Sequence, residues 1–217
     1  MAQNFVGSNN VPMLLPLGQF GTRLQGGKDA ASPRYVYTRL SPMARLLLPR
    51  ADDALLERVT DDGELVEPRT FVPVAPLVLM NGAEGIGTGW STQVPQFHPV
   101  AVIDAVLDRL RGGRLLDPST PWMLRPWYRG FHGPMEVDWS DNGARTLVSQ
   151  GRAKHLSAIE AKIMGLLPRG ASTDGMSQWV EVTELPLKRW TDDFKKQLHR
   201  LTTSGKVVDV QEHHTET

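Results

Sequence analysis

The glycine-rich segment NGAEGIGTGW, at residues 81–90, limits what the middle of this chain can form. It has glycines at 82, 85, 87 and 89. Glycine adopts backbone angles that other residues avoid, and it loses the most conformational freedom on folding. We therefore predict a tight loop at 81–90. The apolar run FVPVAPLVLM, at 71–80, precedes it and is predicted as a buried strand that ends where the glycines begin.

Two functional interpretations of the glycine segment can be weighed against that structural one. A dinucleotide site needs the spacing G-x-G-x-x-G and a P-loop needs a following Lys-Ser/Thr, and this segment has neither. The second interpretation concerns Ile86, a lone branched apolar residue with glycine on both sides. Such a residue can be presented as a wedge that enters the minor groove and unstacks a base step.

Alternating apolar residues, turn signals and helical periodicity predict an α+β chain. Asp61-Asp62-Gly63 predicts the turn of a hairpin within 55–68. Ser41 and Pro42 suit the cap and first position of a short helix. A helix at 98–113 is expected to bury Ile103, Val106, Leu107 and Leu110. Further strands are predicted in 131–137, 144–151 and 177–186, and a flexible loop at 165–177. A final helix, capped by Thr191, would bury Phe194, Leu198 and Leu201.

Composition excludes several classes of protein. The 217 residues are 40% hydrophobic and 22% charged, as in an ordinary globular protein. There is no cysteine, so disulfides and Cys-ligated zinc are excluded. No apolar run approaches a membrane span, and the N-terminus does not resemble a secretory signal. We therefore expect a soluble, intracellular protein whose tryptophans serve core or hinge packing.

Charge is unevenly distributed although the net charge is zero. Residues 1–51 hold six basic side chains and one acidic one, Asp29, so this stretch carries +5 and the remainder −5. A basic segment that contains glycine can bind phosphate groups, and it can equally be a solvated basic surface.

The segment ASPRYVYT, at 31–38, places two of the three tyrosines of the chain next to Arg34. A free phenol, with a pKa near 10, is a poor nucleophile at neutral pH. A neighbouring guanidinium favours the phenolate and can stabilise charge on a phosphoryl oxygen during in-line attack. Tyr35 is therefore a candidate nucleophile, with packing and base stacking as the alternatives that chemistry alone leaves open.

Other polar clusters carry little chemistry. His213 and His214 lack a second group of ligands at a suitable spacing, so a solvated pair is the simpler interpretation. The aspartate pairs 52-53, 61-62 and 192-193 are explained by turns and a helix start. We predict no metal site within this chain.

Several motifs together resemble a known family. They are QNFVGSNN at 3–10, LGQFGTRLQGGKDAASPRY at 17–35, LVLMNGAEGIGTGWS at 77–91, YRGFHG at 128–133 and VEVTELPLKRWTDDFKKQL at 180–198. These segments resemble the breakage-reunion core of eukaryotic-type type II DNA topoisomerases, and the resemblance runs through nearly the whole chain.

The resemblance implies a role for individual residues. Tyr35 matches the tyrosine that attacks a DNA phosphodiester and becomes linked to the 5′ end, and Arg34 matches the arginine that stabilises the transition state. Ile86 matches the isoleucine that intercalates and bends the duplex. DNA-backbone contacts are implied for Gln19, Arg23 and Lys28, whereas Tyr37 has no family role and is expected to pack.

The resemblance also implies the setting of these residues. Residues 1–50 would be the C-terminal part of a winged-helix domain, and residues 51–217 would belong to the tower domain. The chain has no E-G-D-S-A segment and no D-x-D, so we expect it to be part of a longer, homodimeric nuclear enzyme, with an organellar one as the alternative. Mg²⁺ and ATP would be bound by other parts of that enzyme. Alternatively, the isolated chain only binds and bends double-stranded DNA.

Overall fold

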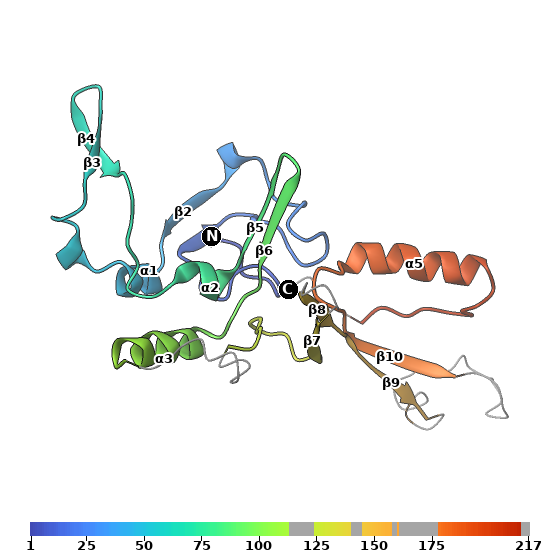
Figure 1. The fold of residues 1–217 in the computed structure, drawn as a ribbon. Helices are drawn as coiled ribbons and strands as arrows, with labels where there is room; N and C mark the ends of the chain where they lie inside the picture. Colours follow the sequence, from blue (N-terminus) through green and yellow to red (C-terminus); the bar gives the residue numbers. More distant parts are fainter. Residues whose placement is uncertain (113–123, 140–144, 158–159, 161–177, 214–217) are drawn as a thin grey trace. The chain divides into compact units, whose positions relative to one another are not determined.

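The computed structural model describes residues 1–112, 124–139, 145–157, 160 and 178–213 (Figure 1). Two compact units make up the chain. The first contains Met1–Gly21 and Ala30–Arg129, and the second contains Thr22–Asp29 and Gly130–Thr217. Within the described residues, every strand belongs to a two-stranded antiparallel pair. Along the chain, an α-helix follows each pair of the first unit, and the last helix follows the last pair of the second. The prediction of a mixed helix and strand fold is confirmed, while the domain boundary expected near residue 50 stays a prediction.

The first unit consists of three strand pairs and short helices. Its strands are β1 (Leu14–Leu17), β2 (Tyr37–Leu40), β3 (Arg58–Asp61), β4 (Glu64–Pro68), β5 (Ala83–Gly87) and β6 (Trp90–Val94). Its α-helices are α1 (Pro42–Leu47), α2 (Leu77–Asn81) and α3 (Pro99–Leu110), and 3-10 turns lie at Pro33–Tyr35 and Arg50–Asp52.

Two local sequence signals in this unit are confirmed. Ser41 caps α1, because its hydroxyl accepts a hydrogen bond from the Ala44 amide at 3.2 Å, with Pro42 at the first position. β3 and β4 form the expected hairpin, in which Asp62 and Gly63 both have positive φ, at 48° and 85°. A two-residue turn with this backbone matches the twist of the strands.

Three predictions in this unit are wrong. Residues 71–80 form no strand, and their last part is α2. Pro73 and Pro76 cannot donate to a strand ladder, whereas proline is tolerated just before a helix. Residues 83–94 form a β-hairpin rather than a loop, since Gly85 and Gly87 adopt strand geometry.

The buried face of α3 is the third wrong prediction. Val102 and Ala105 are its buried residues, whereas Ile103, Leu107 and Leu110 are exposed. The apolar residues of α3 surround much of the helix, so periodicity alone did not determine which side faces the core.

The core of the first unit joins its N-terminal segment to the three α-helices. Its buried members are Val11, Met13, Ala44, Leu47, Ala75, Met80 and Val102. Met80 and Val102 are almost fully enclosed. Because α2 leads directly into β5, this core holds the base of the β5–β6 hairpin.

The second unit contains β7 (Met135–Trp139), β8 (Arg145–Ser149), β9 (Arg152–Leu156), β10 (Trp179–Glu184) and α5 (Thr191–Thr203). The strands expected within 131–137, 144–151 and 177–186 are confirmed, whereas β9 was not predicted. α5 begins at Thr191, which is its first residue rather than its cap. Phe194, Leu198 and Leu201 are half-buried.

Two predictions fall on residues that the structure does not describe. They are the loop predicted at 165–177 and the solvated position of His214. No helix in the described part of the chain is long and apolar enough to cross a membrane.

Candidate functional site

Tyr35 is presented on the surface by a short 3-10 turn. Pro33 begins the turn, and the Tyr35 amide donates to the Ser32 carbonyl at 2.9 Å. Val36 is extended, so the chain leaves the turn directly into β2. The Tyr35 side chain is 70% exposed. The Arg34 guanidinium carbon lies 6.0 Å from the centre of the Tyr35 ring, at the outer limit of a cation–π contact.

Strand β1 and Gly18 lie beside the backbone that leads from the tyrosine turn into β2. β1 pairs antiparallel with β2, with Leu17 opposite Tyr37. Gly18 follows, with φ +120°, and a Cβ there would lie 3.1 Å from Val36 and 3.5 Å from the Tyr35 carbonyl oxygen. A side chain at position 18 would therefore crowd the Val36 side chain and would need a backbone conformation that favours glycine. Tyr37 is exposed, so the packing predicted for it is wrong.

The glycine-containing loop that follows Gly18 closes on itself. The Ala31 amide donates to the Gln19 carbonyl at 3.0 Å. Within the loop, the Asp29 carboxylate accepts from the Thr22 amide at 2.9 Å and from the Thr22 hydroxyl at 2.6 Å. Desolvation raises the pKa of Asp29, but the hydrogen bonds from Thr22 outweigh it and lower that pKa below its usual value. An ionised Asp29 therefore fixes the shape of the loop.

Residues 22–29 belong to the second unit and contact its residues 185–190. The Arg23 guanidinium donates to the Leu185 carbonyl at 2.9 Å. Burial lowers the pKa of Arg23, while the nearby charge of Glu184 acts in the opposite direction. A Cβ on Gly26, where φ is +64°, would lie 2.1 Å from the Trp190 indole, so only glycine fits. Lys28 is exposed.

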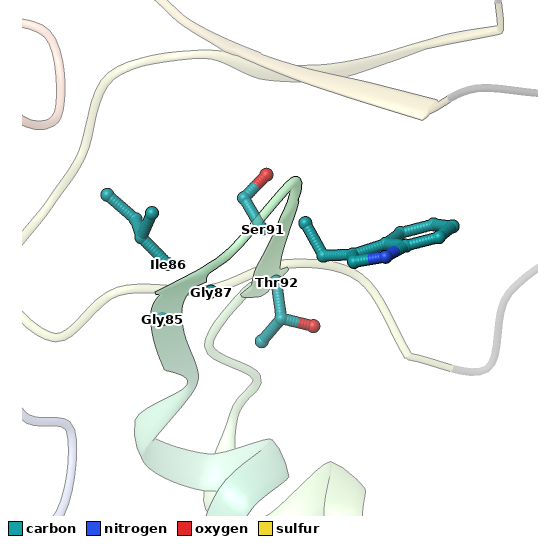
Figure 2. Close-up of a pocket in the computed structure, with 6 residues that line it drawn as sticks. Gly85, Ile86, Gly87, Ser91 and Thr92 are labelled. Atoms are coloured by element: carbon teal, nitrogen blue, oxygen red, sulfur yellow. The ribbon is translucent and has the colours of Figure 1, made fainter.

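Ile86 projects from the β5–β6 hairpin into open space (Figure 2). It is 91% exposed and pairs with Ser91, close to the two-residue turn at Thr88-Gly89. Burying an isoleucine side chain stabilises a fold by about 1.5–3 kcal/mol, so a single fully exposed isoleucine contributes little to this one.

Gly85 and Gly87 lie on the opposite face of the hairpin from Ile86, because successive strand residues point to opposite faces, and they pair there with Thr92 and Trp90. Gly85 has no positive φ, and a Cβ there would meet nothing within 4 Å. At Gly87 the nearest atom would be the Trp90 carbonyl oxygen, at 3.8 Å. The packing of the chain therefore does not require glycine at either position. A shallow depression of ≈ 550 Å³ lies along these residues.

Trp90 contradicts the general expectation that the tryptophans pack in the core or at hinges. It stands opposite Gly87 in the hairpin and is 84% exposed. Sequence reasoning missed this exposed indole, although its position in a glycine-rich turn was a usable signal.

The structure divides the predicted site residues between the two units. Gln19, Arg34, Tyr35 and Ile86 lie in the first unit, and Arg23 and Lys28 lie in the second. Among the described residues, no three His, Asp or Glu side chains gather into a group that could hold a metal ion.

A family model for the A subunit of DNA gyrase/topoisomerase IV matches residues 1–217. The chain belongs to this family. Individual proteins named DNA topoisomerase 2 are also similar to this chain. That of Arabidopsis thaliana is 44% identical over 205 residues, which are 94% of this chain and 12% of that protein. DNA topoisomerase 2-alpha of Rattus norvegicus is 41% identical over 223 residues, covering all of this chain and 13% of the relative.

A solved structure is similar as well. The crystal structure of the Plasmodium falciparum topoisomerase II DNA-binding, cleavage and re-ligation domain matches with a TM-score of 0.75 and 32% identity, over 99% of this chain and 26% of that one. The predicted resemblance to eukaryotic-type type II topoisomerases is thereby confirmed. The chain spans 12% of the Arabidopsis relative, 13% of the Rattus relative and 14% of DNA topoisomerase 2, mitochondrial, of Dictyostelium discoideum.

Proposed function

We propose that this chain is part of an ATP-dependent type II DNA topoisomerase and that Tyr35 makes its transient DNA break. The observation that carries the proposal is the exposed Tyr35, held on a short proline-started turn beside the Arg34 guanidinium. Tyr37 is equally exposed, so the choice of Tyr35 depends on Arg34 beside it and on the resemblance of Pro33-Arg34-Tyr35 to the motif of a family whose relatives are named DNA topoisomerase 2.

The proposed step exchanges one phosphodiester bond of the DNA for a phosphotyrosyl ester. The Tyr35 phenolic oxygen attacks the phosphorus and forms a tyrosyl ester with the 5′ end, while the bond from phosphorus to the 3′ oxygen breaks. The phenolic proton passes to solvent, and the departing 3′ oxygen takes up a proton. Because the ester retains the free energy of the broken bond, religation is the reverse step and needs no external energy.

Arg34 would stabilise the charge that builds on the phosphoryl oxygens. A guanidinium has planar paired donors that match two phosphate oxygens. Its position in the same turn as Tyr35 allows both side chains to reach one phosphate group.

Ile86 would enter the duplex as a wedge. Its exposure, with glycine on both sides of it in the strand, is the feature expected where a nucleic acid comes close to a hairpin backbone. Unstacking one base step would bend the DNA that Tyr35 cleaves.

The DNA-backbone contacts proposed for the glycine-containing loop fall into two kinds. Gln19 and Lys28 are exposed and would contact phosphates directly. Arg23 already donates to the Leu185 carbonyl, so it would act on DNA mainly by holding the loop in place.

The wider setting follows the family. Residues 1–50 would end a winged-helix domain, and 51–217 would form part of the tower domain. Mg²⁺ and ATP would be held elsewhere in a homodimeric enzyme. The nucleus is the proposed location, although one relative is named as mitochondrial.

The decisive experiment replaces Tyr35 by phenylalanine in the complete enzyme. Covalent DNA–protein adducts should disappear while duplex binding is kept, because only the phenolic oxygen is lost. Tyr37→Phe is the matched control, since Tyr37 is equally exposed two positions away and should form adducts normally. Adducts that persist in Tyr35→Phe would refute the assignment and leave the DNA-bending role as the alternative.

A further inference from the structure

Three buried or half-buried amide side chains fix the base of the β5–β6 hairpin to the N-terminal segment. They are Asn10, Asn81 and Gln96, here called the amide clamp. Asn10 is only 6% exposed. The two hydrogens of its Nδ2 are shared among three carbonyls, those of Met80 at 3.0 Å, Phe97 at 3.2 Å and Trp127 at 2.9 Å. Its Oδ1 accepts from the Arg129 amide at 2.8 Å.

Asn81 binds the same N-terminal segment from the opposite direction. Its Oδ1 accepts from the Val11 amide at 2.7 Å, and its Nδ2 donates to the Val11 carbonyl at 2.8 Å. The side chain thus replaces a strand partner for Val11. Gln96, on the other side of the hairpin base, donates to the Ser8 carbonyl. Both ends of the hairpin are therefore attached to residues 8–11.

The same N-terminal segment is also attached to the end of β2, the strand that follows the tyrosine turn. The Ser41 amide donates to the Met13 carbonyl at 2.9 Å, and the Ser41 hydroxyl donates to the Pro12 carbonyl at 2.8 Å. β1 continues from this segment and pairs with β2, which begins two residues after Tyr35. Residues 8–17 thus join the element that carries Tyr35 to the element that carries Ile86.

The β5–β6 hairpin depends on its base for its direction. In the described part of the chain, neither β5 nor β6 packs extensively on any other element. The outer residues of both strands are exposed. Burying polar groups is costly unless they are fully hydrogen-bonded, and such satisfied networks specify one arrangement rather than several.

We propose that Asn10, Asn81 and Gln96 are positioning residues that set the direction of the Ile86 hairpin relative to the Tyr35 turn. The inference rests on the proposed function for its biological meaning, since it concerns the spacing between the inserted side chain and the cleaved phosphate. Its physical content is independent of catalysis. The amides control the direction of the β5–β6 hairpin, beyond their contribution to folding stability.

The test measures that geometry directly in the 217-residue chain. The chain has no cysteine, so Tyr37→Cys and Thr88→Cys provide the only two sites for spin labels. Double electron–electron resonance then gives the distribution of distances between β2 and the hairpin turn. Asn81→Ala, which removes both bonds to Val11, should broaden this distribution about twofold, because the base opens locally while the core stays folded.

Two further variants keep the test decisive. Gln96→Met preserves side-chain length and removes only the donor to Ser8, so it should also broaden the distribution and it decides the question if Asn81→Ala does not fold. Asn9→Ala is the matched control, because the Asn9 amide donates only locally, to the Gln3 carbonyl, and the distribution should stay narrow. If the clamp variants lower the melting temperature but leave the distribution as narrow as in the control, the amides merely stabilise the fold and the proposal is overturned. This outcome is separate from the Tyr35→Phe result, which tests the chemistry without reference to the clamp.

Discussion

Gly82 stands at the start of the β5–β6 hairpin, and its replacement by alanine should be strongly destabilising. Its backbone, at φ 68° and ψ 176°, lies in a region that is essentially restricted to glycine. Forcing another residue into such a region costs about 1–3 kcal/mol. The added Cβ would also lie 2.6 Å from the Val94 carbonyl oxygen. Relieving that overlap requires the two strands to separate, at a further cost of about 1–3 kcal/mol.

The two costs together amount to about 4 kcal/mol. For a chain of this size, that should lower the melting temperature by about 8–16 °C. Thermal unfolding followed by circular dichroism measures the change. Gly85→Ala is the control on the same strand, because a Cβ there meets nothing and the backbone is ordinary. Its effect should stay within about 0.5 kcal/mol.

Equal destabilisation by Gly82→Ala and Gly85→Ala would refute this reasoning. So would an unchanged melting temperature for Gly82→Ala. The expected pattern has a second use. If Gly85→Ala folds normally but bends DNA poorly in the complete enzyme, glycine at position 85 is needed by the nucleic acid rather than by the fold.

Two predictions concern Ile86 and Asp29. Ile86→Ala should reduce DNA bending, measured by energy transfer between dyes flanking the site, with no loss of thermal stability because Ile86 is fully exposed; unaltered bending would exclude the wedge. For Asp29, the folded pKa lies below the unfolded value of about 3.9. Its contribution to stability is therefore complete above that value and is lost as the pH falls through the lower folded pKa. Exchange protection of the Thr22 amide should decline with acid in the natural chain and be independent of pH in Asp29→Asn; the same acid dependence in both would contradict this role.

Sequence patterns predicted the features that short stretches determine. The Ser41-Pro42 helix start depends on one side-chain oxygen and one fixed φ angle, and both act within three residues. The Asp62-Gly63 turn is similar, since positive φ at both positions follows from the residues themselves.

Features that depend on packing were predicted less well. An apolar run such as 71–80 suits a buried strand and a buried helix equally, and only contacts with the rest of the core decide between them. The exposed faces of α3 could not be assigned for the same reason. β9 was missed because its sequence RAKHL, which is mostly polar, becomes a strand only by pairing with β10.

The candidate site shows the same contrast between features set by neighbouring residues and features set by distant ones. The motif residues Arg34, Tyr35 and Ile86 were named from the sequence, by resemblance and by residue chemistry. Their support was not visible there, because Asn10 reaches acceptors 70 to 117 positions away along the chain. No local pattern distinguishes such an asparagine from one that faces solvent.

The attachment of the hairpin at Gly82 would determine which base step the proposed Ile86 wedge enters. Ile86 lies three residues beyond the first residue of β5, and a strand advances about 3.3 Å per residue, so the side chain is carried about 10 Å from the attachment. A tilt of about 20° there would displace Ile86 by about 3.4 Å, which is the rise from one base pair to the next. Small angular errors at residues 80–82 would thus move the wedge to a neighbouring base step, so the accuracy of this attachment would determine how far from the inserted isoleucine a strand is cut.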